Sequence, residues 1–334
     1  MLVRSLILKT SAWGPVERLV RRSFLFRPLV RRFIAGDKLD EAISVSNGLI
    51  EKGLFVTLDF LGENTKSEAE AQAAKTTYKE MLQTIATSPC STPPKVVNLV
   101  KKVPVAAGNS PVSTEETRLE ATNISIKLTQ CGLDQGEEFA ERNFREVLWT
   151  ASERHNFVRV DMESSEYTER TIQMIDRVRS DFPNTGTVLQ SYLYRTDEDI
   201  ERMIEWQARV RLVKGAYLEP AEVAIQDKAK LDEAYVRQAK RLLDAAHYPA
   251  IATHDEKIIN ELTKYVSEKQ IAKESFEFQM LFGIRRDLQD RLRADGFNVR
   301  IYVPFGDSWY PYFTRRLAER PANIFFILKS LFKG

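Results

Sequence analysis

The 334-residue sequence has little of what builds metal or disulfide sites: two cysteines, three histidines and no CxxC motif. Cys90 and Cys131 predict no structural disulfide, and their isolation fits a reducing cytoplasm. One set of potential metal ligands, Asp161, His254 and Glu277, matches no compact ligand spacing, so we expect no bound metal. The sequence also lacks a GxSxG element, a Cys–His pair and a P-loop, which argues against the common nucleophilic and phosphoryl-transfer enzymes.

Long apolar runs are absent as well, and the overall charge is balanced. The net charge of +2 gives no field of one sign, so we expect no nucleic-acid partner. No apolar run approaches the roughly 18 residues that span a bilayer, and the short MLVRSLIL start predicts no secretory signal. Residues 1–36 differ from the rest, with eight Lys or Arg against one Glu and interspersed apolar residues. They predict an amphipathic helix pair that packs on the domain, contacts an anionic membrane surface or serves as an organellar presequence.

Eight short runs rich in apolar and β-branched residues alternate with longer stretches of helical pattern. The runs are 54–60, 124–130, 157–162, 187–192, 209–216, 250–255, 276–281 and 299–306. Strand–helix alternation implies a parallel sheet with right-handed crossovers, and eight units predict an α/β fold of the (β/α)8 TIM-barrel type. A doubly wound sheet is the alternative, but the DFLGENTK stretch after the first strand has a single glycine rather than a glycine-rich turn.

The predicted boundaries divide the chain into two parts. Residues 1–50 are expected to form an N-terminal helical arm, and residues 51–334 the catalytic barrel. Within the barrel, the segment 221–245 is predicted to be one helix. Residues 88–122 are rich in Pro, Ser and Thr and keep no apolar period, so they are predicted to form an extended, mobile loop before the second strand.

The predicted carboxyl ends of the strands carry a ring of polar residues, at the place where such barrels have their active sites. The ring consists of Asp59, Glu63, Lys127, Asp161, Gln190, Arg211, Lys214, Thr253, His254, Gln279 and Tyr302. In RVRLVKGAYLEP (209–220) an apolar strand ends in Lys214, and because burying an unpaired ammonium is costly, we expect a partner or a ligand there. Two interpretations stay open. One is a Schiff-base aldolase or lyase that uses Lys127 or Lys214, and the other is an anionic cofactor or substrate held by Lys127, Arg211 and Lys214.

The last predicted barrel helix, 308–319, carries a second group of polar residues. Tyr312, Arg315 and Glu319 share one face of it. If this helix covers the barrel mouth, the adjacent Arg315 and Arg316 can bind a carboxylate through charge-assisted hydrogen bonds. An Arg–Glu pair on an exposed helix would give the same pattern.

Nine motifs, in the same order along the chain, resemble the proline dehydrogenase family. They are RRFIAG (31–36), DFLGE (59–63), SIKLTQ (125–130), RVDMESS (159–165), VLQSYLYRT (188–196), RLVKGAYLEP (211–220), ATHD (252–255), FEFQMLFG (276–283) and VRIYVPFGDSWYPYFTRRLAERPAN (299–323). The resemblance covers most of the chain apart from residues 1–30 and the loop near 88–122. Proline dehydrogenases are flavin-dependent oxidoreductases that convert L-proline to 1-pyrroline-5-carboxylate, the first step of proline catabolism. No aldehyde dehydrogenase half follows, so the resemblance is to the monofunctional bacterial type.

The resemblance implies roles for most of the strand-end residues. Noncovalent FAD would be bound by Met162, Gln190, Arg211, Lys214, Gly215, Ala216, Thr253 and His254, with Gly215 letting the cofactor approach the backbone. Proline would be bound by Lys127, Tyr217, Leu281, Tyr302, Tyr312, Arg315 and Arg316. Arg211, Asp161 and Lys127 would serve catalysis, and Glu63 would gate the closed site by pairing with Arg315. The final helix would lie over the mouth of a distorted barrel.

The resemblance also implies that electrons pass to a membrane quinone, so a cytoplasmic enzyme would contact the inner face of the cell membrane peripherally. Three other functions stay open: a Schiff-base lyase, a barrel that binds proline without turnover, and a relative specific for hydroxyproline. The extra hydroxyl of hydroxyproline would need a smaller residue in place of Tyr302, which favours proline itself.

Overall fold

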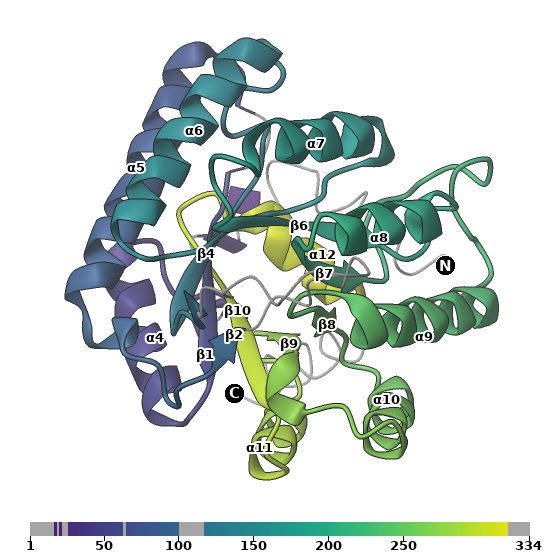
Figure 1. Cartoon of the computed structure of the whole chain (residues 1–334). Helices are drawn as coiled ribbons and strands as arrows, with labels where there is room; N and C mark the ends of the chain where they lie inside the picture. Colours follow the sequence, from purple (N-terminus) through teal and green to yellow (C-terminus); the bar gives the residue numbers. More distant parts are fainter. Residues whose placement is uncertain (1–16, 19, 22–25, 63–64, 100–116, 320–334) are drawn as a thin grey trace, which may run out of the picture.

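A closed barrel of eight parallel strands forms the centre of the protein. The computed structural model describes residues 17–18, 20–21, 26–62, 65–99 and 117–319. The strands are β1 (Phe55–Phe60), β4 (Thr122–Ile126), β5 (Val158–Val160), β6 (Thr185–Gln190), β7 (Arg209–Val213), β8 (Ala250–Ala252), β9 (Glu277–Leu281) and β10 (Asn298–Phe305). They pair in the order β1-β10-β9-β8-β7-β6-β5-β4, and β4 closes the ring on β1. The predicted (β/α)8 barrel is confirmed, and each of the eight expected runs overlaps one of its strands (Figure 1).

An outer layer of helices surrounds the strands in Figure 1. These are α4 (Leu39–Glu51), α5 (Glu68–Thr87), α6 (Glu137–Glu153), α7 (Ser165–Val178), α8 (Thr196–Glu205), α9 (Lys228–Ala245), α10 (Glu256–Glu268) and α11 (Arg286–Ala294). Each buries an apolar stripe on the strands, as expected for helices that cover a parallel sheet. Ala42, Ile43 and Leu49 place α4 in the same core as the barrel strands. The division of the chain at residue 50 stays a prediction.

Two predicted elements end or begin elsewhere. The helix expected over 221–245 starts only at Lys228, because Asp227 caps its first turn and the preceding segment is tied back through an antiparallel bridge between Leu193 and Ala224. Strand β4 stops at Ile126, and β7 stops at Val213. The strand-end lysines therefore lie in loops just beyond the sheet.

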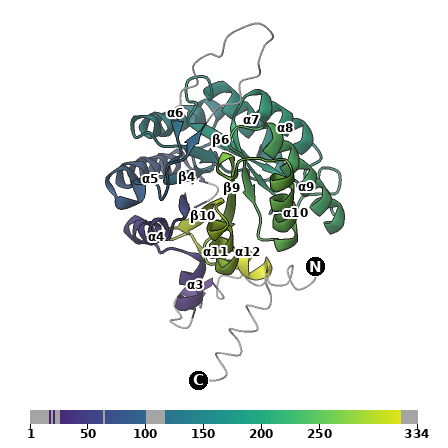
Figure 2. The same ribbon diagram turned by 60° about the horizontal axis from the view of Figure 1, so that its bottom comes forward.

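A second hydrophobic cluster lies at the carboxyl ends of the strands. Helix α3 (Arg27–Phe33) packs beside α12 (Tyr310–Glu319), and the two lie side by side in Figure 2. Phe33 and Ile34 share this cluster with Trp309, Tyr310 and other apolar residues. In Figure 1, α12 crosses the opening of the barrel, as expected for the final helix.

The opposite end of the barrel is closed by the two ends of the predicted loop 88–122. A 3-10 turn, η1 (Pro89–Ser91), leads to β2 (Asn98–Leu99), which pairs antiparallel with β3 (Thr117–Arg118). Val97, Leu99 and Leu119 are buried in a cluster with Phe55 and Tyr248. The middle of the loop, residues 100–116, lies outside the described residues.

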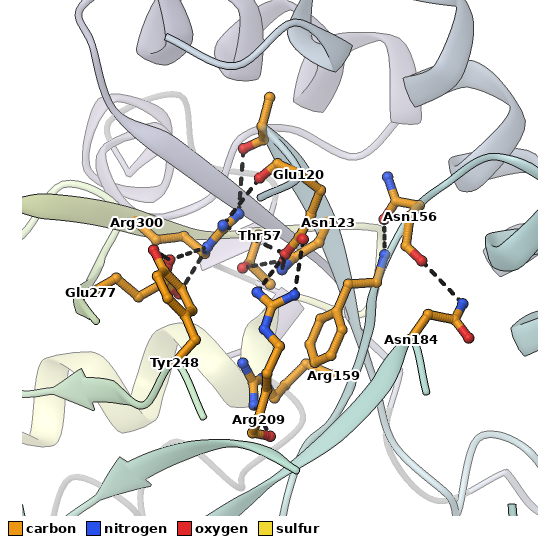
Figure 3. Close-up of polar contacts among 12 residues, drawn as sticks. Thr57, Glu120, Asn123, Asn156, Arg159, Asn184, Arg209, Tyr248, Glu277 and Arg300 are labelled. Atoms are coloured by element: carbon orange, nitrogen blue, oxygen red, sulfur yellow. Dashed lines mark hydrogen bonds and ion pairs between the residues drawn. The ribbon is translucent and has the colours of Figure 1, made fainter. Parts of the chain in front are cut away.

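Inside this closed end, the barrel contains buried ion pairs (Figure 3). Arg209 donates two hydrogen bonds to the Glu120 carboxylate, at 2.9 and 2.8 Å, and Arg300 donates to Glu277 at 2.9 and 3.0 Å. Arg159 is also buried and donates through Nη1 to two backbone carbonyls, those of Thr187 and Arg209. Three guanidinium groups thus meet two carboxylates at the base of the barrel.

We expect an Arg209→Met substitution to destabilise the fold by roughly 3–5 kcal/mol, because it leaves the Glu120 carboxylate buried with much less compensation. The matched control is Arg241→Met, which removes an Arg–Glu pair of similar geometry at the surface. Because solvent screens that exposed pair, its loss should change the stability by less than about 1 kcal/mol. Urea unfolding measures both, and equal losses would contradict the buried-pair account.

The acid limit of stability provides a second prediction. Burial raises the pKa of Glu120, but Arg209 and Arg300 outweigh burial and lower it from 4.5 to about 2. The carboxylate therefore stabilises the fold above pH 4.5, and this contribution is lost as the pH falls towards 2. A Glu120→Gln variant should be less stable at neutral pH and should lose less stability between pH 5 and 3 than the wild type. Urea midpoints across this range, with the exposed Glu205→Gln as control, measure the difference in slope.

Candidate active site

A cavity of about 440 Å3 opens at the carboxyl ends of the barrel strands. Sixteen of the seventeen residues that the sequence assigns to a site line it, and the seventeenth, Glu63, lies outside the described residues. The remaining lining residues are Asp59, Val188, Val213, Ala252, Asp255, Gln279 and Met280. The volume lies in the range of roughly 300–1,000 Å3 that small-molecule and cofactor sites occupy.

At the floor of the cavity, the Asp161 carboxylate holds several side chains together. Arg211 Nη1 donates to Asp161 Oδ1 at 2.7 Å, and the Tyr302 hydroxyl donates to Oδ2 at 2.6 Å. Lys127 Nζ lies 3.9 Å from the same carboxylate and donates to Asp59 Oδ1 at 2.9 Å. Five strands thereby contribute to one network, since Asp59, Arg211 and Tyr302 belong to β1, β7 and β10, and Lys127 and Asp161 lie just beyond β4 and β5.

Further contacts fix the direction of the Arg211 guanidinium. Its Nε donates to Gln279, its Nη2 donates to the Ser125 hydroxyl at 3.2 Å, and its carbon lies 5.1 Å from the centre of the Tyr302 ring. Each of its three nitrogens therefore has an acceptor. A guanidinium held this way is a fixed positive charge at the floor of the cavity.

Burial shifts two ionisable groups of this network. Burial raises the pKa of Asp59, against the opposing effect of the Lys127 ammonium, and the nearby Asp161 charge adds to the rise. Burial also raises the pKa of the Tyr302 hydroxyl well above its ordinary value, and the Asp161 carboxylate reinforces this. Tyr302 is therefore a neutral hydrogen-bond donor.

Lys214, the cation at the end of the apolar strand, has two carboxylate partners. Its Nζ bonds to Asp232 on α9 and to Asp255, 3.3 Å away, at the start of α10. About a quarter of its side chain remains exposed. Sequence reasoning missed both partners, because they lie 18 and 41 residues further along the chain in helical regions.

Gly215 follows Lys214 with a φ of +117°, a conformation that other residues rarely adopt. A Cβ at this position would lie 2.5 Å from ring carbons of Tyr192. The backbone conformation and the nearby Tyr192 ring therefore both require glycine here, in addition to the expected approach of a cofactor. Gly215 and the two residues after it line the cavity.

Directed polar groups line the cavity at the end of β6 and just beyond β8. His254 Nε2 accepts a hydrogen bond from the backbone N–H of Leu281 at 2.9 Å, so in the neutral ring the proton is on Nδ1. The Gln190 amide donates to the Glu163 carbonyl at 2.9 Å, and the Thr253 hydroxyl accepts from the Asp255 N–H at 3.1 Å. These groups leave little freedom for the side chains to rotate.

Helix α12 provides the opposite wall. Tyr312, Arg315 and Arg316 all line the cavity, which confirms that the final helix brings its two arginines to the barrel mouth. The Arg316 guanidinium carbon lies 5.2 Å from the centre of the Tyr312 ring. The side chain of Glu319, which shares a predicted face with Arg315, is outside the described part of the chain.

The described residues offer neither a metal site nor a membrane span. No group of three or more His, Cys, Asp or Glu side chains among residues 17–319, gaps excepted, is arranged to hold a metal ion. None of the helices described is long and apolar enough to cross a bilayer. The cavity is lined by apolar and aromatic side chains, by amides and hydroxyls, by three Asp carboxylates and by five Lys or Arg side chains, so the cations outnumber the carboxylates and an anionic organic ligand suits the site.

Comparison with known proteins identifies the family. The family model for proline dehydrogenase matches residues 42–328. This chain belongs to the proline dehydrogenase family. Proline dehydrogenase 1 of Bacillus subtilis (strain 168) is 39% identical over 303 residues, which cover 91% of this chain and 90% of that protein. Proline dehydrogenase of Deinococcus radiodurans is 36% identical and covers 100% of this chain and 99% of its own length. The resemblance predicted from nine motifs is confirmed, and the family is one of flavoenzymes.

A solved structure is similar over nearly the whole chain. Proline utilization A from Bdellovibrio bacteriovorus, inactivated by N-propargylglycine, has a TM-score of 0.77 and 25% sequence identity. The match covers 95% of this chain and 36% of that protein. The barrel described above is therefore shared with part of that protein.

We expect Gly215→Ala to destabilise the protein by roughly 1–3 kcal/mol, because alanine is strained at positive φ and its methyl group overlaps the Tyr192 ring. The matched control is Gly48→Ala in the middle of α4, where an added Cβ meets nothing within 4 Å. Alanine there should stabilise by about 0.5–1 kcal/mol, since it favours the helix. Thermal unfolding of both variants is the measurement, and a Gly215→Ala protein as stable as the wild type would refute the strain.

Proposed function

We propose that this chain oxidises L-proline to 1-pyrroline-5-carboxylate with FAD bound in the strand-end cavity. The proposal rests on the observation that cations line one cavity on two sides. Arg211 and Lys214 lie on the barrel side, and Arg315 and Arg316 face them from α12. A ligand with a carboxylate and a ring, stacked on a planar anionic cofactor, suits this arrangement.

The substrate end of the cavity is assigned to the side toward α12. Arg315 and Arg316 would bind the proline carboxylate, and Lys127 would complete its charge neutralisation. Tyr302 and Tyr312, with Tyr217 and Leu281, would enclose the pyrrolidine ring and exclude water. Tyr302 is held by its hydrogen bond to Asp161, so its ring cannot rotate freely to admit a hydroxylated substrate.

FAD would lie against the barrel side of the cavity. Bound there, it supplies the two-electron acceptor for the hydride that leaves C5 of proline. Arg211, Gln190, Thr253 and His254 would contact it, as would Met162 and the Lys214–Gly215–Ala216 segment. The fixed positive charge of Arg211 favours electron density on the ring beside it, because it needs no reorganisation during the reaction.

The proton on the substrate amine needs no histidine base. His254 Nε2 already accepts the Leu281 N–H, and both oxygens of Asp161 already accept hydrogen bonds. The surrounding cations disfavour a protonated amine. Proline would therefore react as the neutral amine, after losing its proton to water at the mouth.

The competing functions fit the site less well. A Schiff-base lysine needs its amine free to attack a carbonyl, whereas the Nζ atoms of Lys127 and Lys214 are each paired with carboxylates. A barrel that only binds proline would not need the fixed guanidinium at its floor. Neither rival accounts for cations on both sides of the cavity.

The route of the electrons extends the proposal beyond the described residues. The proposed final electron acceptor is a quinone at the membrane surface. The enzyme would be cytoplasmic and would contact the inner face of the membrane through its basic residues 1–36. Glu63, which would pair with Arg315 to gate the mouth, belongs to this part of the proposal.

The purified protein should show flavin absorption that bleaches on anaerobic addition of L-proline. An Arg316→Met variant should need about 10–100-fold more proline for half-maximal bleaching, since it loses a charge-assisted bond to the carboxylate. Pyrrolidine, which has no carboxylate, is the control substrate and should bleach both proteins equally. A protein that cannot be loaded with FAD, or a variant equally impaired with both substrates, would contradict the assignment.

A further inference from the structure

A side-chain contact joins the beginning of the described chain to the start of helix α12. Arg21, one of four described helical residues near the N-terminus, donates through Nη1 to the backbone carbonyl of Asp307 at 2.8 Å. Its guanidinium carbon lies 5.0 Å from the centre of the Trp309 ring and 5.8 Å from that of Tyr310. The two partners are 286 residues apart in the sequence.

The guanidinium is itself oriented by neighbouring residues. Its Nε donates to Glu17 at 2.7 Å, one helical turn earlier, and Val20 packs against the apolar cluster that contains Trp309 and Tyr310. Two thirds of the Arg21 side chain is covered. A cation over aromatic rings, held by a carboxylate and a carbonyl, is a directed contact rather than a mobile surface group.

This contact acts on the start of α12. Asp307 lies in the turn after β10, and Tyr310 is the first residue of the helix. Arg315 and Arg316 follow five and six residues later, about 8–9 Å along the helix axis. Because a short helix moves as a rigid body, fixing its first turn also fixes where its two arginines point.

A second hollow supports the same relation. Glu17 and Arg21 line it together with Asp307, Tyr312 and Arg315. Tyr312 and Arg315 also line the active-site cavity. Helix α12 is thus a partition with the N-terminal residues on one side and the substrate cavity on the other.

We propose that Arg21 is a positioning residue for the substrate carboxylate, which acts by holding the first turn of α12 over the barrel mouth. The inference rests on the proposed function, because it assigns the carboxylate to Arg315 and Arg316. Arg21 touches neither substrate nor cofactor. Its loss leaves the barrel floor and the cofactor contacts in place and loosens only the helix that carries the two arginines.

The test compares Arg21→Ala with Arg18→Ala in the full-length, FAD-loaded protein. Arg18 lies on the same short helix, is exposed, and forms no ion pair within the described part of the chain. The probe is tetrahydrofuran-2-carboxylate, a ring carboxylate that cannot be oxidised to an imine, and its binding is followed by the flavin spectrum. The KM for proline, kcat, FAD content and Tm are measured on the same samples.

We expect Arg21→Ala to raise the Kd of the probe and the KM for proline by about tenfold, with kcat, FAD content and Tm close to wild type. Arg18→Ala should change none of these values, and Arg21→Lys, which keeps the charge over the rings, should recover part of the affinity. An Arg21→Ala variant with unchanged Kd would overturn the proposal. So would an equal loss of affinity for tetrahydrofurfuryl alcohol, which lacks the carboxylate. Failure of the wild type itself to bleach with proline would refute the proposed function instead.

Discussion

The Asp161 carboxylate is the group on which the arrangement of the active site depends. It accepts from Arg211 on β7 and Tyr302 on β10, and Lys127 lies within ion-pair distance. Without this negative charge, the guanidinium and the ammonium at the cavity floor would repel one another across a medium of low dielectric constant. With it, both cations are held in one orientation before any ligand enters. The floor of the site is therefore organised by the strands, and only the α12 wall depends on other parts of the chain.

Charge is also buried at the opposite end of the barrel, where its role differs. Glu120 and Glu277 pair with Arg209 and Arg300, and Arg159 lies close enough to both ends that Arg211 and Arg209 each lower its pKa, after burial itself. Buried ion pairs gain little net stability, since desolvation offsets their attraction. They do make an incorrect strand register unfavourable, because a shifted strand would leave a charge unpaired. The polar lumen thus selects one register among strands whose outer faces are largely apolar.

The sequence predicted the barrel well because its strands are short, β-branched and regularly spaced. Position at a strand end, which is a property of one segment, placed polar residues such as Lys127 and Arg211 at the cavity, and the final helix and the family motifs supplied the others. The sequence did not predict ion-pair partners that lie far apart along the chain. Asp232 and Asp255 reach Lys214 from helix starts, and Glu120 reaches Arg209 from a segment that sequence composition describes only as irregular. Such pairings depend on strand register and side-chain reach, which no local pattern contains. The same limit explains the helix expected from residue 221, because a distant bridge to Leu193 decides where it starts.

The closure of the ring by β1 and β10 has a consequence for biosynthesis. Strand β1 leaves the ribosome early and pairs with β4 and with the last strand, and α12 follows that strand directly. A nascent chain can assemble β4 to β9 in order, but β1 keeps an exposed edge until residues 298–305 emerge. Arg315 and Arg316, which line the cavity, come later still. A translation product truncated before α12 would therefore resemble the barrel in part but lack one wall of the cavity, so the cavity is complete only after residue 316 has been added.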